Sequence, residues 1–292
     1  MLLDREEFIE QAYFFRSLRE RLAMNLPMQE LLANLREEVL STTKLPMAID
    51  FLATELLHEG LLHPGMKQLS HYFMPFQTYV IAESERERGR FDMRVGLEIL
   101  QREAEYRAKE PTRAGIFLYH FETISRNRLR YDPGLAATAE DPTFDDDWKA
   151  WLQELRHQVG IVDLADLVYF RSQHYLTRQE RLGQEVEGDI PILFGEKEGQ
   201  IAFANRRKEP LLLLLALQRH LGYPAVPRPE KHENSDLVPQ MSRRIERLES
   251  RLKLLEDEQK GGIDITQFYG SPDSNKGLGA SDSMRPGDPN EG

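Results

Sequence analysis

The amino-acid sequence predicts a mainly α-helical protein, and three observations support this. Apolar residues recur three and four residues apart through most of the chain as far as Leu182, as on one face of a helix. Proline and glycine stand where such stretches begin and end. Alternating apolar residues, which are typical of β-strands, occur only in residues 190–203. We therefore expect a multi-helix array or bundle, then a small α+β module with one β-hairpin, a C-terminal coiled coil and a disordered tail.

The first predicted domain covers residues 1–133 and contains only helices. Asp4 can cap a first helix with Glu7 at its third position, and apolar residues follow at helical spacing to Leu22. Prolines then precede or open further helical stretches, since a first helical turn does not need the amide hydrogen that proline lacks. These prolines are Pro27, Pro46, Pro64, Pro75 and Pro111. The stretch after Pro75 extends to about Ala108, and Gly89 predicts a break within it.

A predicted linker, residues 134–145, is rich in Ala, Thr, Asp and Pro and separates this domain from a second module, residues 146–223. Two helices are expected first, through Trp148 and through Leu164. A β-hairpin follows, and a helix through the leucine run then closes the module at Gly222. The alternating residues of the hairpin are Ile190, Ile192, Phe194, Ile201 and Phe203.

A second proline-rich linker, residues 224–235, leads to a predicted coiled coil at residues 236–260. Its apolar residues step by 3, 4, 3, 4 and 3, which is the spacing of the a and d positions of heptads. They are Val238, Met241, Ile245, Leu248, Leu252 and Leu255. In this register Arg244 and Arg251 occupy g positions and would face Glu249 and Glu256 of a second, parallel chain. The chain itself is therefore one predicted partner, in a parallel homodimer.

Residues 261–292 are predicted to be a disordered tail, because they consist mostly of Gly, Ser, Asp, Asn and Pro. So few apolar groups cannot offset the entropy lost on ordering. Phe268 and Tyr269 form either a short docking motif for a partner or an incidental aromatic pair.

Composition narrows the possible functions. The formal charge of -11, from 49 acidic and 38 basic residues, disfavours binding to nucleic acid and to anionic membranes. Without cysteine the chain has no disulfide, no thiolate metal ligand and no cysteine nucleophile. The N-terminus lacks the pattern of a signal peptide, and the longest apolar run, Leu211 to Leu217, is far shorter than the about 20 residues that cross a bilayer. We therefore expect a cytoplasmic protein outside the membrane.

No motif predicts catalytic, cofactor-binding or metal-binding residues. The sequence lacks a phosphate-binding loop, a dinucleotide fingerprint and a Gly-x-Ser-x-Gly elbow. Two Glu-x-x-His pairs, Glu55 with His58 and Glu154 with His157, have the spacing found in helical-bundle metal proteins. With eight histidines, chance alone supplies roughly one such pair.

One basic cluster is a candidate contact for an anion or for an acidic partner: Arg126, Arg128 and Arg130. The alternative is a solvated helix end, where cations interact favourably with the helix dipole.

Three functions remain open on these patterns. The first is a non-enzymatic scaffold or adapter that binds an unidentified protein and self-associates through the coiled coil. The second is a DNA-binding regulator in which residues 148–204 form a winged-helix arrangement, although its glutamates oppose phosphate contacts. It would use Arg171, Gln173, His174, Arg178 and Arg181. The third is a helical-bundle metal protein.

Overall fold

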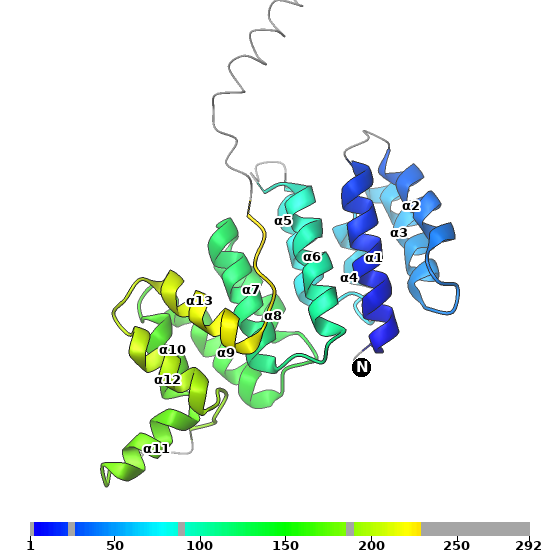
Figure 1. The fold of residues 1–292 in the computed structure, drawn as a ribbon. Helices are drawn as coiled ribbons and strands as arrows, with labels where there is room; N and C mark the ends of the chain where they lie inside the picture. Colours follow the sequence, from blue (N-terminus) through cyan, green and yellow to red (C-terminus); the bar gives the residue numbers. More distant parts are fainter. Residues whose placement is uncertain (1–2, 23–26, 87–90, 185–189, 229–292) are drawn as a thin grey trace, which may run out of the picture. The chain divides into compact units, whose positions relative to one another are not determined.

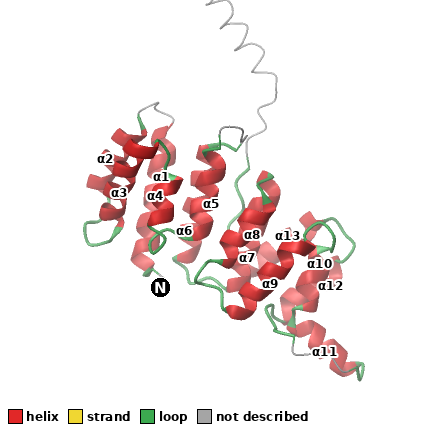
Figure 2. Cartoon of the chain, turned by 180° about the vertical axis from the view of Figure 1, so that it is seen from behind, coloured by secondary structure: helices red, strands yellow, loops and turns green. Residues whose placement is uncertain are grey.

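The computed structural model describes residues 3–22, 27–86, 91–184 and 190–228. These residues form thirteen α-helices, and no strand is found among them (Figures 1 and 2). The prediction of a mainly α-helical protein is confirmed. Their bounds are α1 Arg5–Leu22, α2 Met28–Glu38, α3 Leu45–Glu59, α4 His63–Gln68, α5 Pro75–Ser84, α6 Met93–Arg107, α7 Arg113–Asn127, α8 Tyr131–Ala139, α9 Asp146–Gln158, α10 Leu164–Phe170, α11 Gln173–Arg181, α12 Glu196–Asn205 and α13 Pro210–Leu221.

The helix ends follow from local chemistry in the sequence. The Thr112 hydroxyl accepts a hydrogen bond from the Gly115 amide, and the carboxylates of Asp145 and Asp163 cap α9 and α10 in the same way. Gly60 ends α3 and Gly222 ends α13, with φ of 72° and 69°, a region that glycine enters at little cost. The expected long helix after Pro75 is divided into α5, which ends at Ser84, and α6, which begins at Met93.

The helices pack against neighbours that are both near and far in the sequence. α1 lies along α6, α2 along α3, and α5 against both α6 and α8 (Figure 1). In the second half α8 packs on α9, α10 on α12, and α13 on α7. The chain as far as Glu230 is one compact unit; residues 231–292 form the other unit. The predicted coiled coil 236–260, with its seam from Val238 to Leu255, and the tail 261–292 lie outside the described residues, as does the end of the linker 224–235.

The predicted linker at residues 134–145 is instead part of the packed structure. Its first half belongs to α8, and Leu135 and Phe144 are buried in the core. Alanine favours a helix, and Gly134 lets α8 approach closely: a Cβ there would lie 2.7 Å from Ile124 Cδ1. The small residues of this predicted linker therefore allow tight helix packing.

The predicted β-hairpin is wrong. Residues 196–205, which were to contain its second strand, form α12, and only Phe194 makes an isolated bridge, to Ser172. Two alternating residues are too few to distinguish a strand from a helix. Gly199 matters more, because a Cβ there would lie 2.2 Å from Ser172 Oγ, so glycine allows α12 to pack on this segment. The winged-helix hypothesis requires this β-hairpin as its wing, and the described residues form α12 in place of the second strand.

None of the helices in the described ranges has both the length and the apolar character needed to cross a bilayer. The leucine run lies in α13, which has 12 residues and buries Leu213, Leu214 and Leu217.

Candidate functional site

An open apolar groove lies where α7 ends, α8 begins, α9 turns into α10, and α13 begins. Its volume is about 740 Å³. Most of its lining is apolar, with leucines from α10 and α13 and an aromatic ring from α7 at the base. The lining residues are Phe121, Ser125, Arg126, Tyr131, Val159, Gly160, Val162, Asp163, Leu164, Leu167, Lys208, Pro210, Leu211 and Leu214. We call these residues the α7–α10–α13 groove.

Two local features fix the shape of this groove. Gly160, with φ of 85°, makes the turn between α9 and α10. Asp163 accepts a hydrogen bond from the Ala165 amide at 3.1 Å through one carboxylate oxygen, and from the Arg207 amide at 3.0 Å through the other. This carboxylate ties the start of α10 to the segment before α13. The Arg206–Asp166 ion pair joins the same two segments, so two aspartates of α10 and its cap hold the walls of the groove together.

Large apolar side chains are exposed at the edge of the groove. Ile161, at the tip of the turn after α9, is 82% exposed, and its neighbours Gly160 and Val162 line the groove. Tyr131, Leu212 and Leu215 are also exposed. Exposed apolar side chains beside an apolar groove are typical of a surface that another molecule covers.

The three arginines of the predicted basic cluster lie in three different surroundings. Arg126 lines the groove and forms an ion pair with the buried Glu122, whose other oxygen accepts a hydrogen bond from the Tyr223 hydroxyl at 2.8 Å. Burial and the Glu122 charge raise the pKa of Tyr223. Arg130 turns to α5, where its guanidinium lies 2.5 Å from Glu83 Oε1. Arg128 is exposed at the end of α7, with φ of 55°. An anion or partner contact by these arginines stays a prediction.

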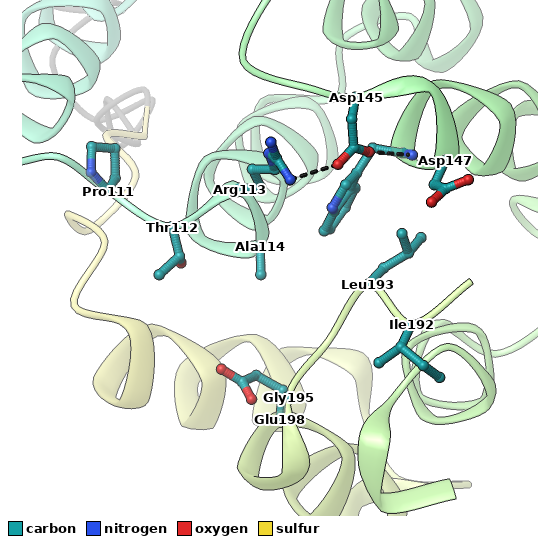
Figure 3. A pocket seen from close by; sticks show the side chains of 11 residues that line it. Pro111, Thr112, Arg113, Ala114, Asp145, Asp147, Ile192, Leu193, Gly195 and Glu198 are labelled. Atoms are coloured by element: carbon teal, nitrogen blue, oxygen red, sulfur yellow. Dashed lines mark hydrogen bonds and ion pairs between the residues drawn. The ribbon is translucent and has the colours of Figure 1, made fainter. Parts of the chain in front are cut away.

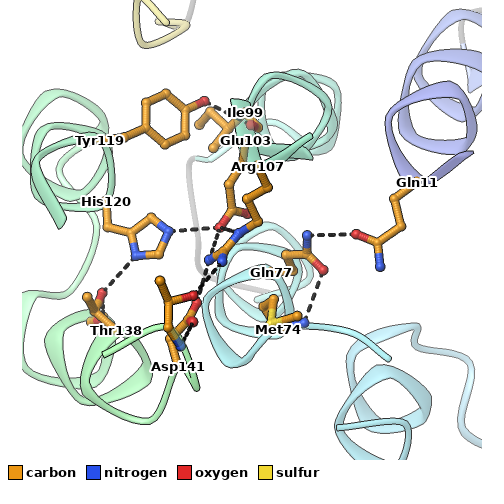
Figure 4. Close-up of polar contacts among 12 residues, drawn as sticks. Gln11, Met74, Gln77, Ile99, Glu103, Arg107, Tyr119, His120, Thr138 and Asp141 are labelled. Atoms are coloured by element: carbon orange, nitrogen blue, oxygen red, sulfur yellow. Dashed lines mark hydrogen bonds and ion pairs between the residues drawn. The ribbon is translucent and has the colours of Figure 1, made fainter. Parts of the chain in front are cut away.

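A second candidate site, which is polar, lies in the core and joins α6, α7 and the turn after α8 (Figure 4). Glu103 and Arg107 come from α6, His120 from α7, and Asp141 from the turn, and all are buried. Glu103 Oε1 lies 2.8 Å from both His120 Nε2 and Arg107 Nη2. Arg107 also pairs with Asp141. We call these four residues the buried ion cluster.

Electrostatics keep the acids of the buried ion cluster ionised. Burial opposes ionisation of Asp141, but Arg107, His120 and the hydrogen bonds from Thr143 together hold the pKa of Asp141 below its usual value. Burial likewise opposes ionisation of Glu103, and Arg107 and His120 together hold the pKa of its carboxyl below the usual value. The cluster therefore places two ionised carboxylates against one arginine and one histidine in the core.

The buried ion cluster has the residue types of a metal site, but an arginine already pairs with both of its carboxylates. Glu103, His120 and Asp141 each place one possible ligand atom within 4.8 Å of the others. However, the Arg107 guanidinium bonds to both carboxylates, so a metal ion would have to displace it. The His120 ring also stacks on Phe76, with centroids 3.6 Å apart, which fixes its orientation. We interpret the cluster as a structural tie between helices.

In the described part of the chain, neither Glu-x-x-His pair belongs to a group of three acidic or histidine side chains that could hold a metal ion. Glu55 accepts a hydrogen bond from Gln68, and Glu154 pairs with Arg171 and accepts from Gln158.

A third candidate site is a recess of about 530 Å³ beside the start of α7 and the start of α9 (Figure 3). Its charged groups are largely engaged: Arg113 pairs with Asp145 at 2.5 Å, and Glu198 accepts a hydrogen bond from His220 at 3.2 Å. Asp145 also caps the Trp148 amide. The Arg113–Asp145 pair joins the start of α7 to the start of α9, and the Glu198–His220 contact joins α12 to α13. Together they leave little unpartnered charge to select a ligand.

Comparison of the chain with protein-family models, with curated proteins and with solved structures finds no match in any of the three. The function must therefore be argued from the groove, the buried ion cluster and the sequence.

Proposed function

We propose that this protein is a non-enzymatic adapter, in which the α7–α10–α13 groove holds a segment of a partner protein and the coiled coil joins two copies. The observation that supports this most is the groove itself. It is open and apolar, and Ile161 stands 82% exposed at its edge. Such a surface is typical of protein docking sites, where a few apolar anchors of the partner enter a groove.

The coiled coil would give this adapter two linked grooves. A partner that carries two copies of its segment would then bind with avidity, since its second contact becomes intramolecular. Weak single contacts are sufficient in such an arrangement. A cytoplasmic location belongs to the same proposal, and it accords with the lack of cysteine.

Self-association provides the first test. The double substitution Ile245→Asp, Leu252→Asp places charges in the predicted seam, and we expect it to convert a dimer into a monomer in sedimentation equilibrium at micromolar concentration. The matched control, Ser250→Asp with Lys253→Asp, changes positions outside the seam and should remain dimeric. A wild-type chain that is already monomeric would contradict the coiled coil.

Partner capture provides the second test. We expect tagged wild-type protein to retain a defined set of proteins from a nuclease-treated extract, and the variant Ile161→Asp, Leu211→Asp to lose them. The control Met47→Asp, Leu57→Asp changes two exposed residues of α3 and should retain the set. Proteins that stay bound to the groove variant would exclude the groove as the docking site. Proteins that disappear after nuclease treatment would favour nucleic-acid binding instead.

A further inference from the structure

We infer that the segment recognised by the α7–α10–α13 groove is an acidic peptide with at least two apolar anchors. This inference rests on the proposed adapter function, because it specifies the partner of the same groove. Three charged residues line the groove: Arg126, Asp163 and Lys208. Which of them already have partners decides which charge a ligand should carry.

The acidic groups at the groove are already used. Both oxygens of Asp163 accept backbone hydrogen bonds, from Ala165 and from Arg207. Glu122, which lies behind Arg126, is occupied by that arginine and by Tyr223. The acidic side chain of the lining, Asp163, therefore already has partners on both of its oxygens.

The basic groups are less engaged. Lys208 is exposed on the lining and forms no ion pair with a residue that the structure describes. Arg207 precedes it and is exposed with φ of 60°, held by its amide bond to Asp163. Arg207 and Glu209, on either side of Lys208, are both exposed and neither belongs to the lining. Among the charged side chains of the lining, Lys208 is the one left without an ion pair or a hydrogen bond in the described residues, so the group that remains to pair with a ligand is a cation and favours an acidic ligand.

The apolar base of the groove determines the anchors. Phe121, Leu164, Leu167 and Leu214 are buried beneath it, and Leu211 forms one wall. A volume of about 740 Å³ is in the range of sites that bury a few large side chains. A peptide with two or three leucine, isoleucine or aromatic residues would fill this base, while its carboxylates face Lys208.

The experiment is a selection from a random library of twelve-residue peptides displayed on phage. The full chain is the bait, and binders that also bind the variant Ile161→Ser, Leu211→Ser, which leaves the charge of the groove unchanged, are removed. We expect the enriched peptides to carry net negative charge and at least two apolar residues. Enriched peptides that are neutral or basic, or no enrichment over the groove variant, would overturn the inference.

A synthetic copy of the most enriched peptide then tests the charge directly by fluorescence anisotropy. We expect Lys208→Glu to weaken binding about tenfold and added salt to weaken wild-type binding. The control Lys67→Glu, at an exposed lysine of α4, should change affinity less than twofold. Equal effects of the two reversals would contradict the role of Lys208.

The result separates this inference from the proposed function. If capture from an extract depends on the groove while selected peptides are not acidic, the adapter function stands and the partner chemistry is wrong. If the Ile245→Asp, Leu252→Asp chain still self-associates and the groove substitutions abolish that self-association, the occupant is a second copy, and the inference is also overturned.

Discussion

Replacing Arg107 by leucine is expected to lower the free energy of unfolding by about 3 to 5 kcal/mol. The substitution leaves Glu103 and Asp141 in the core without the cation that now bonds to both. Two buried carboxylates would then have to become protonated or draw in water. Urea unfolding followed by far-UV circular dichroism measures the change.

The matched control for this prediction is Arg113→Leu, which also removes an arginine from an ion pair with an aspartate. Arg113 and Asp145 are 51% and 43% exposed, so the expected loss is at most about 1 kcal/mol. Adding Glu103→Gln and Asp141→Asn to the Arg107→Leu chain should restore part of the lost stability, because the uncompensated charges are removed. Equal losses for Arg107→Leu and Arg113→Leu would show that the buried ion cluster does not stabilise the fold.

Local signals in the sequence were sufficient for the helices of the first half. Apolar spacing, prolines in first turns and capping residues such as Thr112 act over a few residues, and the structure shows helices where these signals occur. The groove and the buried ion cluster depend on contacts between distant segments. For example, Arg107 and Asp141 are 34 residues apart, and no local pattern indicates that they meet.

One signal of the buried ion cluster was present in the sequence. His120 stands in the apolar stretch IFLYHF, and Glu103 with Arg107 has the i, i+4 spacing of an ion pair on one helix face. A polar residue within a buried face requires a partner, so this pattern predicts that His120 meets a charged group. That the partner of His120 is Glu103 depends on the packing of α6 against α7, which the local sequence does not show.

The two errors of sequence interpretation concern residues whose role is set by tertiary packing. The alanines of α8 are common both in linkers and at close helix contacts, and the short alternation at Ile201 and Phe203 fits either type of structure. The predicted linker suggested a boundary between two domains near residue 134. The structure instead places Phe194, from the second predicted module, against Phe117 of α7, with ring centroids 6.2 Å apart.

Replacing Phe194 by alanine is therefore expected to destabilise the whole compact unit, by about 3 to 5 kcal/mol. The side chain is 1% exposed and also packs on Trp148 and Trp151, with centroids 5.2 and 5.5 Å away. The control Phe170→Ala removes a ring that is 41% exposed and should have a much smaller effect. Both substitutions are best made in the Ile245→Asp, Leu252→Asp chain, so that coiled-coil unfolding does not contribute.

Two optical signals distinguish one cooperative unit from two domains. Fluorescence arises from Trp148 and Trp151, the two tryptophans of the chain, whereas circular dichroism reports all helices, including α1 to α6. If the helices as far as α13 unfold together, Phe194→Ala shifts both urea transitions to the same lower midpoint. If the predicted boundary near residue 134 were correct, fluorescence would shift while a large part of the dichroism change kept the wild-type midpoint, because α1 to α6 would unfold independently of the aromatic cluster.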